Sequence, residues 1–468
     1  MKKLSDLFPN APDVFVNDIK INSKEVFEGD IFVCVTGVTA DRNDYIKEAI
    51  DNGAVCIVTT KKIDVPCFLY VVDDPDLYLI TLAKKLYDYD DNLTLIATTG
   101  TNGKTTVASI ISSMIGNDMC GYLGTNGIEC NKFSYDIKNT TPGQDRLFKY
   151  FKMLKDAGCK YVSMEASSEA FLRKRLSGLS FDIGILTDIT SDHMNAHGSL
   201  ENYIACKKEL FENIKDNGFS ILNVDSMYFS EFKNITKGKI LTYGKKKSDL
   251  EIIDYKLYLD HTFIKLKYKS VIYSFDSPLL GEFNIYNLCC SILTLIALNY
   301  NISDIIERVK LIKLPKGRVE LIDYGQDYKI ILDYAHNTDA LKKLYKFLHD
   351  VGEHRIISVT GSAGGRDKDK RKHMGKVVLD NSFYTIFTMD DPRFEDVNEI
   401  IDDLVSISNK NNYERIIDRK EAINKAFDIA KKDDIVLILG KGHDNYMAIG
   451  DQYLPYNDFE VIKDYFIK

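Results

Sequence analysis

The chain has 468 residues, of which 45% are hydrophobic and 28% are charged, as in a globular protein of about three domains. Its formal net charge of −8 argues against a general binder of nucleic acid or of membrane surfaces, although a local basic pocket remains compatible with it. The longest apolar stretch, Leu288–Leu298, is too short to cross a bilayer, and the N-terminal segment lacks the apolar core of a signal peptide. The nine cysteines show no paired metal-binding spacing, so we expect free thiols in a reducing cytoplasm.

Residues 1–90 predict a small α/β domain. Strands are expected at residues 30–37 and 54–59, with a helix at residues 44–52 between them. The polar loop Asn22-Ser23-Lys24 either holds a phosphate group or has no ligand. An acidic run at residues 88–92 is typical of a linker.

The stretch Leu93–Thr106 predicts a phosphate-binding loop. The apolar run 93–97 is suited to a buried strand, residues 98–103 are small and flexible, and a helix is expected at residues 104–115. In this arrangement Lys104 would reach the β- and γ-phosphates, and the Thr105 hydroxyl would bind Mg²⁺. The generic pattern has Gly where this chain has Thr98, so a surface turn that caps a helix is the alternative.

Residues 91–314 predict a nucleotide-binding domain built on a parallel sheet. Two predicted strands end at Glu165 and at a polar segment that contains His193. Ligands gather at the carboxyl ends of parallel strands, so both side chains are expected near the phosphate loop, where they would suit a second divalent ion. The alternative is a helix cap at Asp192 and a surface imidazole at His193. Strands are predicted at residues 161–164, 183–187 and 221–224.

Three further segments follow in this domain. An amphipathic helix at residues 201–211 contains Lys207, a residue type that most often lies on a solvated face. Residues 250–276 alternate apolar and polar side chains, which predicts antiparallel strands beside or at the edge of the parallel sheet. In the first turn of an apolar helix that ends near residue 300, Asn284 and Asn287 would either cap the helix or read a base.

From residue 315 to 468 the pattern is strand and helix in alternation. Each predicted strand ends in a polar or Gly-rich loop, which gathers these loops on one functional rim of the sheet. A second GK[ST] motif is absent, so this domain is not expected to hold a nucleoside triphosphate of its own. The strands are predicted at residues 330–332, 355–359, 384–388 and 435–439, and the loops at residues 333–336, 361–367, 390–393 and 440–444.

The order and spacing of these motifs resemble the ATP-dependent Mur ligases of peptidoglycan synthesis over essentially the whole chain. The matching strings are TTGTNGKTT, GEFNIYN, GRVE, DYAHNTDA, GxxGGRDxxKR and GKGHD. The N-terminal NSK and VFEGDIFV strings are most similar to the member that adds the third residue of the peptide. The implied fold is α/β, with a small N-terminal domain, a central P-loop ATPase domain with a β-rich excursion, and a C-terminal Rossmann-like domain.

The resemblance also implies roles for individual residues. Catalytic roles fall to Lys104, Glu165, His193 and Lys207, and Mg²⁺ ligands to Thr105, Glu165, His193 and Lys207. Because the family carbamylates the Lys in Y-x-x-x-K-x-x-x-F, Lys207 would be N6-carboxylysine, an oxygen ligand. ATP contacts would be Gly100, Thr101, Asn102, Gly103, Lys104, Thr105, Thr106, Asn287, Arg318 and Asp333. The UDP-sugar-peptide would meet Ser23, Thr140, Thr141, Ser168 and Arg175, and the amino acid Asp391, Pro392, Arg393, Gly440 and Asp444.

The implied activity is amide-bond formation between UDP-N-acetylmuramoyl-L-alanyl-D-glutamate and a diamino acid in the cytoplasm, by a monomer acting on small molecules. Relatives that add diaminopimelate typically show D-N-P-R where this chain has Asp390-Asp391-Pro392-Arg393, and lysine-adding relatives usually lack the Arg. A guanidinium pairs with a carboxylate, so Arg393 favours meso-diaminopimelate or lanthionine over lysine. Asp391 could instead attract a side-chain ammonium.

Four departures from the family pattern touch substrate binding rather than the phosphate loop. They are Asn22 and Lys24 around Ser23, Glu169 in place of His, Ser191 in place of Arg, and Asp444 in place of Glu. Two rival functions remain, a folate polyglutamyl-type ligase and a nucleotide-binding homologue without catalysis. The N-terminal domain argues against the first, and intact Lys104, Glu165, His193 and Lys207 argue against the second.

Overall fold

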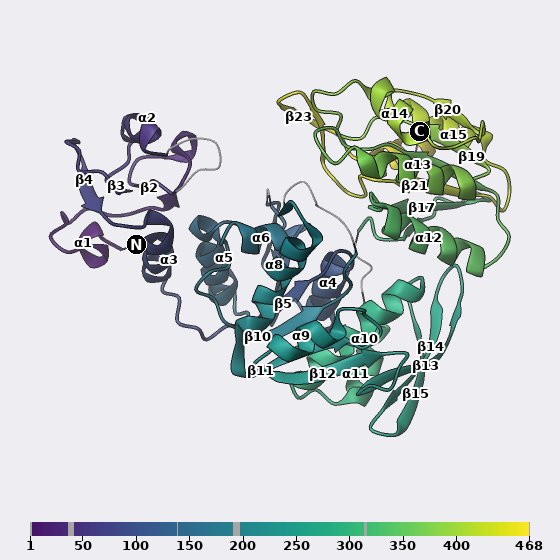
Figure 1. Cartoon of the computed structure of the whole chain (residues 1–468), viewed down its shortest axis with the longest axis horizontal. Helices are drawn as coiled ribbons and strands as arrows, with labels where there is room; N and C mark the ends of the chain where they lie inside the picture. The colour runs from purple at the N-terminus through teal and green to yellow at the C-terminus, as the bar shows by residue number, and fades with distance from the viewer. Residues whose placement is uncertain (1, 36–41, 138, 191–196, 313–315, 468) are drawn as a thin grey trace.

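The computed structural model describes residues 2–35, 42–137, 139–190, 197–312 and 316–467, which form three separate main sheets. Figure 1 shows the N-terminal part on one side of the central part and the C-terminal part above the other. None of the helices within these ranges has the length and hydrophobicity needed to span a bilayer.

The N-terminal sheet is parallel and has the order β1-β2-β3-β4. Its second strand, Ile31–Val33, is shorter than the predicted 30–37: Asp30, Cys34 and Val35 lie outside the strand, and residues 36 and 37 lie outside the described ranges. The predicted helix at 44–52 consists of a 3-10 turn followed by α2. The elements are α1 (Leu4–Leu7), β1 (Ile19–Lys20), η1 (Ser23–Glu25), β2 (Ile31–Val33), η2 (Arg42–Tyr45), α2 (Ile46–Asp51), β3 (Cys56–Thr59), β4 (Phe68–Val71) and α3 (Pro75–Leu86).

The central sheet has eleven strands in the order β15-β14-β13-β12-β11-β10-β5-β9-β6-β7-β8. Its middle is parallel, and the predicted antiparallel structure at 250–276 is confirmed as the meander β13–β15 at one edge. The elements are β5 (Thr94–Thr99), α4 (Lys104–Ile115), β6 (Cys120–Gly124), β7 (Gly127–Cys130), β8 (Phe133–Tyr135), α5 (Gln144–Asp156), β9 (Tyr161–Glu165), α6 (Ser168–Leu172), β10 (Phe181–Leu186), α8 (Leu200–Glu212), β11 (Ile214–Asn223), α9 (Phe229–Ile235), β12 (Lys239–Gly244), β13 (Leu250–Leu257), β14 (Thr262–Tyr268), β15 (Val271–Ser277), α10 (Glu282–Ala297) and α11 (Ile302–Val309).

Helices cover both faces of the central sheet. Apolar side chains of α4 and α10 form one core with the sheet, whereas those of α5 and α8 pack on the opposite face, in a core that continues into the N-terminal part. Burial on both faces explains why the central strands read as nearly continuous apolar runs. The predicted helix 104–115 is confirmed, while β5 extends two residues beyond its predicted end because Thr98 and Thr99 pair with Glu165 and Leu186.

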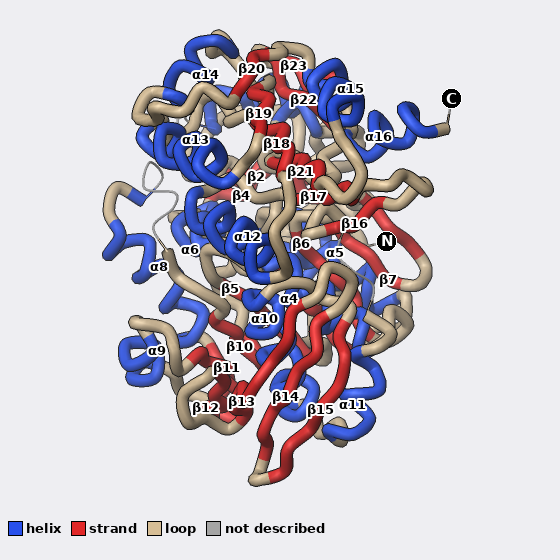
Figure 2. The backbone as a smooth tube through the Cα atoms, turned by 90° about the vertical axis from the view of Figure 1, so that its right-hand side faces the viewer, coloured by secondary structure: helices blue, strands red, loops and turns tan. Residues whose placement is uncertain are grey.

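The C-terminal sheet has the order β16-β17-β21-β18-β19-β20, and its strands are parallel apart from β16. The four predicted strands are confirmed (Figure 2). The carboxyl end of β17 faces the central part, because Asp333 lines the same cavity as Asn102 and Asn287. The elements are β16 (Glu320–Ile322), β17 (Lys329–Asp333), α12 (Thr338–Asp350), β18 (Ile356–Thr360), α13 (Asp369–Asn381), β19 (Tyr384–Phe387), α14 (Val397–Val405), β20 (Tyr413–Arg415), α15 (Arg419–Ile429), β21 (Ile435–Leu439), β22 (Tyr446–Ile449), β23 (Gln452–Pro455) and α16 (Asp458–Phe466).

Candidate active site

The loop between β5 and α4 has the geometry of a phosphate cradle. Gly103 precedes the helix with φ +87°, and a Cβ there would lie 2.6 Å from Asn287 Oδ1, so only glycine fits. The Lys104 ammonium folds back over the loop and donates to the carbonyls of Gly100 at 2.9 Å and Thr101 at 3.0 Å. A cation and a helix N-terminus therefore lie at one place, which suits an anion.

Glu165, at the end of β9, lies beside this loop and is 1% exposed. Its Oε2 accepts from the Thr105 hydroxyl at 2.9 Å, and its Oε1 accepts from the Tyr122 hydroxyl at 2.7 Å and from the Thr125 N–H at 2.8 Å. Gly124 lies so close that a Cβ would be 2.2 Å from Glu165 Oε1. The carboxylate is thus fixed next to the hydroxyl of the phosphate loop, and oxygen donors of this kind suit Mg²⁺.

Lys207 of α8 is buried, with 1% exposure, which reverses the expectation of a solvated face. Its ammonium donates to the Gly100 carbonyl at 2.9 Å and lies 4.2 Å from the centroid of the Tyr203 ring. The Tyr203 hydroxyl in turn lies 3.0 Å from the Thr101 hydroxyl. Hence Lys207 lies at the same loop as Thr105, where a carbamate would add an oxygen ligand. His193, the predicted fourth ligand, lies outside the described residues.

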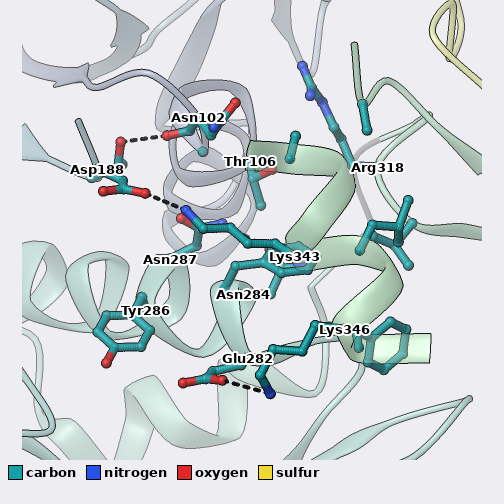
Figure 3. A pocket seen from close by; sticks show the side chains of 18 of the residues that line it. Asn102, Thr106, Asp188, Glu282, Asn284, Tyr286, Asn287, Arg318, Lys343 and Lys346 are labelled. Atoms are coloured by element: carbon teal, nitrogen blue, oxygen red, sulfur yellow. Dashed lines mark hydrogen bonds and ion pairs between the residues drawn. The ribbon is translucent and has the colours of Figure 1, made fainter. Parts of the chain in front are cut away.

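A cavity of about 430 Å³ opens between the phosphate loop, α10 and the C-terminal part (Figure 3). Six of the ten predicted ATP contacts line it, namely Asn102, Gly103, Thr106, Asn287, Arg318 and Asp333, whereas Gly100, Thr101, Lys104 and Thr105 are not among its lining residues. Asn284 and Asn287 do not cap α10, whose N-cap is Gly281. Asn284 donates to the Leu280 carbonyl, and Asn287 donates to Asn284 Oδ1.

The C-terminal side of this cavity is fixed by Arg318 and Asp333. The Arg318 guanidinium donates to Thr105 Oγ1 at 3.3 Å and lies 4.7 Å from the centroid of the Tyr334 ring. Asp333 accepts from the N–H groups of Val319 and Ala335, both at 2.7 Å, while burial raises the pKa of its carboxyl group. Arg318 therefore reaches from the C-terminal part to the phosphate loop.

Sequence analysis missed Lys343 of α12, which extends across the cavity to Asp188 after β10 (Figure 3). Lys343 also pairs with Asp339 at 2.8 Å, and Asn102 of the phosphate loop donates to the same Asp339 carboxylate at 3.1 Å. Tyr122 and Thr125 were missed as well. The only signal for them was a strand that ends in Gly124 before a polar turn.

The predicted sugar-peptide contacts of the central part gather beside Glu165. Thr141 Oγ1 donates to the Glu165 carbonyl at 2.8 Å, and Arg175 donates to the Thr141 carbonyl at 3.1 Å. Thr140 Oγ1 lies 3.1 Å from the Thr125 hydroxyl, and Ser168 Oγ lies 3.1 Å from His197 Nε2. Ser23 belongs to the N-terminal part, where its hydroxyl donates to Glu48.

The predicted amino-acid pocket is built around Lys441, which is fully buried. Its ammonium donates to Asp391 Oδ1 at 2.8 Å and lies 3.7 Å from Asp444 and 4.0 Å from Asp390. Sequence analysis left open that Asp391 attracts a side-chain ammonium group, and in this structure Asp391 pairs with the ammonium group of Lys441. Burial raises the pKa of Asp444 to about 6, although Lys441 opposes this shift. Close packing surrounds this cluster, since a Cβ on Gly440 would lie 2.3 Å from Asp390 Oδ2.

Arg393 is held by the β22–β23 hairpin. Its N–H donates to the Ala448 carbonyl at 3.0 Å, its carbonyl accepts from the Gly450 N–H at 2.8 Å, and its φ is +53°. Its Nε is buried without a hydrogen-bond partner among the described residues. Pro392 precedes it, with its carbonyl close to Gly364. This backbone conformation is uncommon for a non-glycine residue, as is often found in binding loops.

Fold and site together define a three-part P-loop protein. Its candidate nucleotide cavity lies between the central part and the C-terminal α/β part. Two family models match the chain, Mur ligase middle domain at residues 98–295 and Mur ligase, glutamate ligase domain at residues 317–442. The chain belongs to the Mur ligase family.

The chain is 35% identical over 454 residues to the UDP-N-acetylmuramoyl-L-alanyl-D-glutamate–2,6-diaminopimelate ligase of Fusobacterium nucleatum, covering 95% of this chain and 93% of that protein. It is 32% identical to UDP-N-acetylmuramyl-tripeptide synthetase 2 of Oceanobacillus iheyensis, covering 95% of this chain and 92% of that protein. A solved structure of a UDP-N-acetylmuramoyl-L-alanyl-D-glutamate–2,6-diaminopimelate ligase matches with a TM-score of 0.68 and 27% identity, covering 100% of this chain and 99% of that one.

Proposed function

We propose that the chain uses ATP to join a diamino acid to UDP-N-acetylmuramoyl-L-alanyl-D-glutamate in the synthesis of peptidoglycan precursors. The observation that carries this proposal is that two neighbouring cavities share a wall. Arg318 and Tyr334 line the nucleotide cavity and also a second cavity of about 660 Å³ that contains Asp444, Tyr122 and Thr125. ATP in the first cavity would therefore lie next to a carboxylate and an amine bound in the second cavity.

The proposed reaction has two steps. The γ-phosphoryl group of ATP passes to the terminal carboxylate of the peptide, giving an acyl phosphate and ADP. The amine then attacks the acyl carbon, and inorganic phosphate leaves. Lys104 and Arg318 would offset the negative charge as two anions approach, because both cations lie at the phosphate loop. Thr140 and Thr141 would align the carboxylate beside Glu165.

We assign the metal site to Thr105, Glu165, His193 and carbamylated Lys207. The buried Glu165 carboxylate next to the Thr105 hydroxyl supports this assignment. Mg²⁺ held there would supply charge neutralisation for phosphoryl transfer. Without modification, the Lys207 side chain is a protonated ammonium group, which cannot bind a metal cation. Carbamylation is therefore part of the proposal.

For the amino acid we propose meso-diaminopimelate. The unpartnered Nε of Arg393 leaves guanidinium hydrogen-bonding capacity for a distal carboxylate, which lysine lacks. Asp444 would pair with an ammonium group of the substrate. Lanthionine has the same charged groups and is the first alternative, and lysine is the second.

The three sheets support a division of labour that we propose along the predicted boundaries. Residues 1–90 would bind the UDP part, residues 91–314 ATP, and residues 315–468 the amino acid. The small-molecule substrates suit a cytoplasmic enzyme that acts as a monomer without nucleic acid.

The test is phosphate release from ATP with the UDP-dipeptide and, in parallel, meso-diaminopimelate, lanthionine or L-lysine. Release that depends on a diamino diacid supports the proposal and the role of Arg393. Release with lysine alone keeps the ligase and removes that role. No release with any of them, despite nucleotide binding, would instead favour a folate-type acceptor or a non-catalytic homologue.

A further inference from the structure

The two cavities share a wall that contains Arg318 and Tyr334, and two chain segments that are far apart in sequence lie against each other beside it. One contains Gly317 and Arg318 and leads into β16. The other is the loop Gly440–Asp444 that follows β21. Arg318 reaches the phosphate loop from this wall, whereas Asp444 faces the second cavity.

Glu320 joins the two segments through a single carboxylate oxygen. Its Oε2 accepts from the Gly317 N–H at 2.6 Å and from His443 Nε2 at 2.8 Å. Burial opposes ionisation of Glu320, but these hydrogen bonds outweigh it, and the pKa of its carboxyl group lies below its usual value. The pair is therefore a charge-assisted contact between the segments.

The two segments are closely packed against each other. Gly317 has φ +65°, and a Cβ there would lie 2.8 Å from the Gly442 Cα. The Tyr334 N–H donates to the Gly317 carbonyl at 2.9 Å. The His443 ring stacks on Phe459, with centroids 5.2 Å apart and planes at 29°. A displacement of His443 would hence be passed to the backbone beside Arg318.

We propose that Glu320 and His443 are a positioning pair that couples the amino-acid pocket to the nucleotide site. An amino acid that binds beside Asp444 restrains the Gly440–Asp444 loop, and through His443 and Glu320 it restrains Arg318 at the phosphate loop. Nucleotide and amino acid therefore strengthen each other's binding, by reciprocity of coupled sites. This inference rests on the proposed function, because it assumes ATP in one cavity and the amino acid in the other.

The test measures the affinity of the intact protein for the β,γ-imido analogue of ATP by calorimetry. Each titration is run with the UDP-dipeptide present, and with or without the amino acid that the wild type ligates. We expect the amino acid to tighten nucleotide binding about tenfold in the wild type. His443→Leu should remove most of this enhancement and raise the KM for the amino acid, while the affinity for nucleotide alone stays within about twofold of the wild type.

His443→Gln retains an N–H donor for Glu320 and should recover part of the enhancement, which a general packing role would not predict. Glu320→Gln weakens the charge-assisted contact with little change in volume and should show an intermediate loss. His261→Leu is the matched control, because His261 also pairs with a carboxylate, Asp260 at 2.7 Å, and stacks on Tyr258, with ring centroids 4.3 Å apart, away from both cavities.

The failures of the two proposals can be told apart. A wild type that ligates but shows no enhancement, or His443→Leu and Glu320→Gln variants that keep the wild-type enhancement, would overturn the inference and leave the ligase intact. A wild type that forms no product with any of the three amino acids would overturn the proposed function first.

Discussion

The position of Lys207 in the structure is the opposite of the one that its sequence context predicts. A lysine in an amphipathic helix is expected on a solvated face, yet this one is buried against Gly100 and Tyr203. The burial of a charged side chain costs free energy, so a functional reason for its position is expected.

We predict that Lys207→Ala lowers the rate of phosphate release at least 100-fold, because the proposed carbamate ligand could no longer form. A short-chain carboxylic acid such as acetate, which can occupy the space of the carbamate, should restore part of the rate. Lys208→Ala is the matched control, since that side chain pairs with Glu231 at the surface. Full activity of Lys207→Ala without added acid would remove Lys207 from the metal site.

The raised pKa of Asp444 predicts that the KM for the diamino acid depends on pH. Its pKa is raised to about 6 because burial and the neighbouring Asp390 and Asp391 outweigh Lys441 and Arg318. Only the ionised form attracts an ammonium group, so the KM for the diamino acid should fall as the pH rises from 5 to 7. Asp444→Asn should flatten this profile. An unchanged profile in the variant would exclude Asp444 as its source.

The same shift has a consequence for stability. A carboxyl group whose pKa is higher in the folded state favours folding below its unfolded pKa of 3.8, and this contribution disappears as the pH rises through 6. At pH 7.5, Asp444→Asn should therefore increase the free energy of unfolding, by on the order of 3 kcal/mol. Denaturant unfolding at pH 7.5 checks this, and a destabilised variant would contradict it.

At the scale of elements, helix α12 links the C-terminal part to the nucleotide site. Its first turns bring Asn337 and Asp339 to Asn102, with 3.1 Å for each hydrogen bond, and place Lys343 against Asp188. Asp188 follows β10 at the carboxyl end of the parallel sheet, so the ion pair spans the cavity beside the expected triphosphate.

We expect Lys343→Met to raise the KM for ATP several-fold with a smaller change in kcat, because the helix is held less firmly against the phosphate loop. Lys342→Met, on the exposed side of the same helix, is the control. The double exchange Asp188→Lys with Lys343→Asp should recover part of the lost affinity. If the single variant binds ATP as the wild type does at low and high salt, the ion pair has no part in nucleotide binding.

Elements also show where sequence analysis succeeds. The phosphate loop was predictable because strand, loop and helix are adjacent in the chain and each has a strong local pattern. Contacts between distant segments were not. Nothing local indicates that Lys441 pairs with Asp391 fifty residues earlier, or that Tyr122 and Thr125 hold Glu165. The extension of β5 to Thr99 likewise depends on partners in β9 and β10.

At the scale of the whole molecule, the parts share apolar packing and are also linked by several polar contacts. Lys149 and Arg146 of α5 pair with Asp18 and Glu25 of the N-terminal part, and Arg318 reaches the phosphate loop from the C-terminal part. Interfaces that include polar contacts of this kind permit relative motion of domains. An acyl phosphate is labile in water, so closure around the substrates would protect it.

We predict that the radius of gyration from X-ray scattering falls when the β,γ-imido analogue of ATP and the UDP-dipeptide are both bound. Lys343→Met should show a smaller fall, because one contact that favours closure is missing. Identical scattering profiles with and without the substrates would count against a closing motion.

The most direct test of the account is mass spectrometry of the UDP-sugar product. The wild type is incubated with ATP, Mg²⁺, the UDP-dipeptide and an equimolar mixture of meso-diaminopimelate, lanthionine and L-lysine. We predict a tripeptide product that contains a diamino diacid, formed with one ADP per product, and its loss in Lys207→Ala. Exclusive incorporation of lysine would contradict the role of Arg393, and the absence of any extended product would contradict the ligase itself.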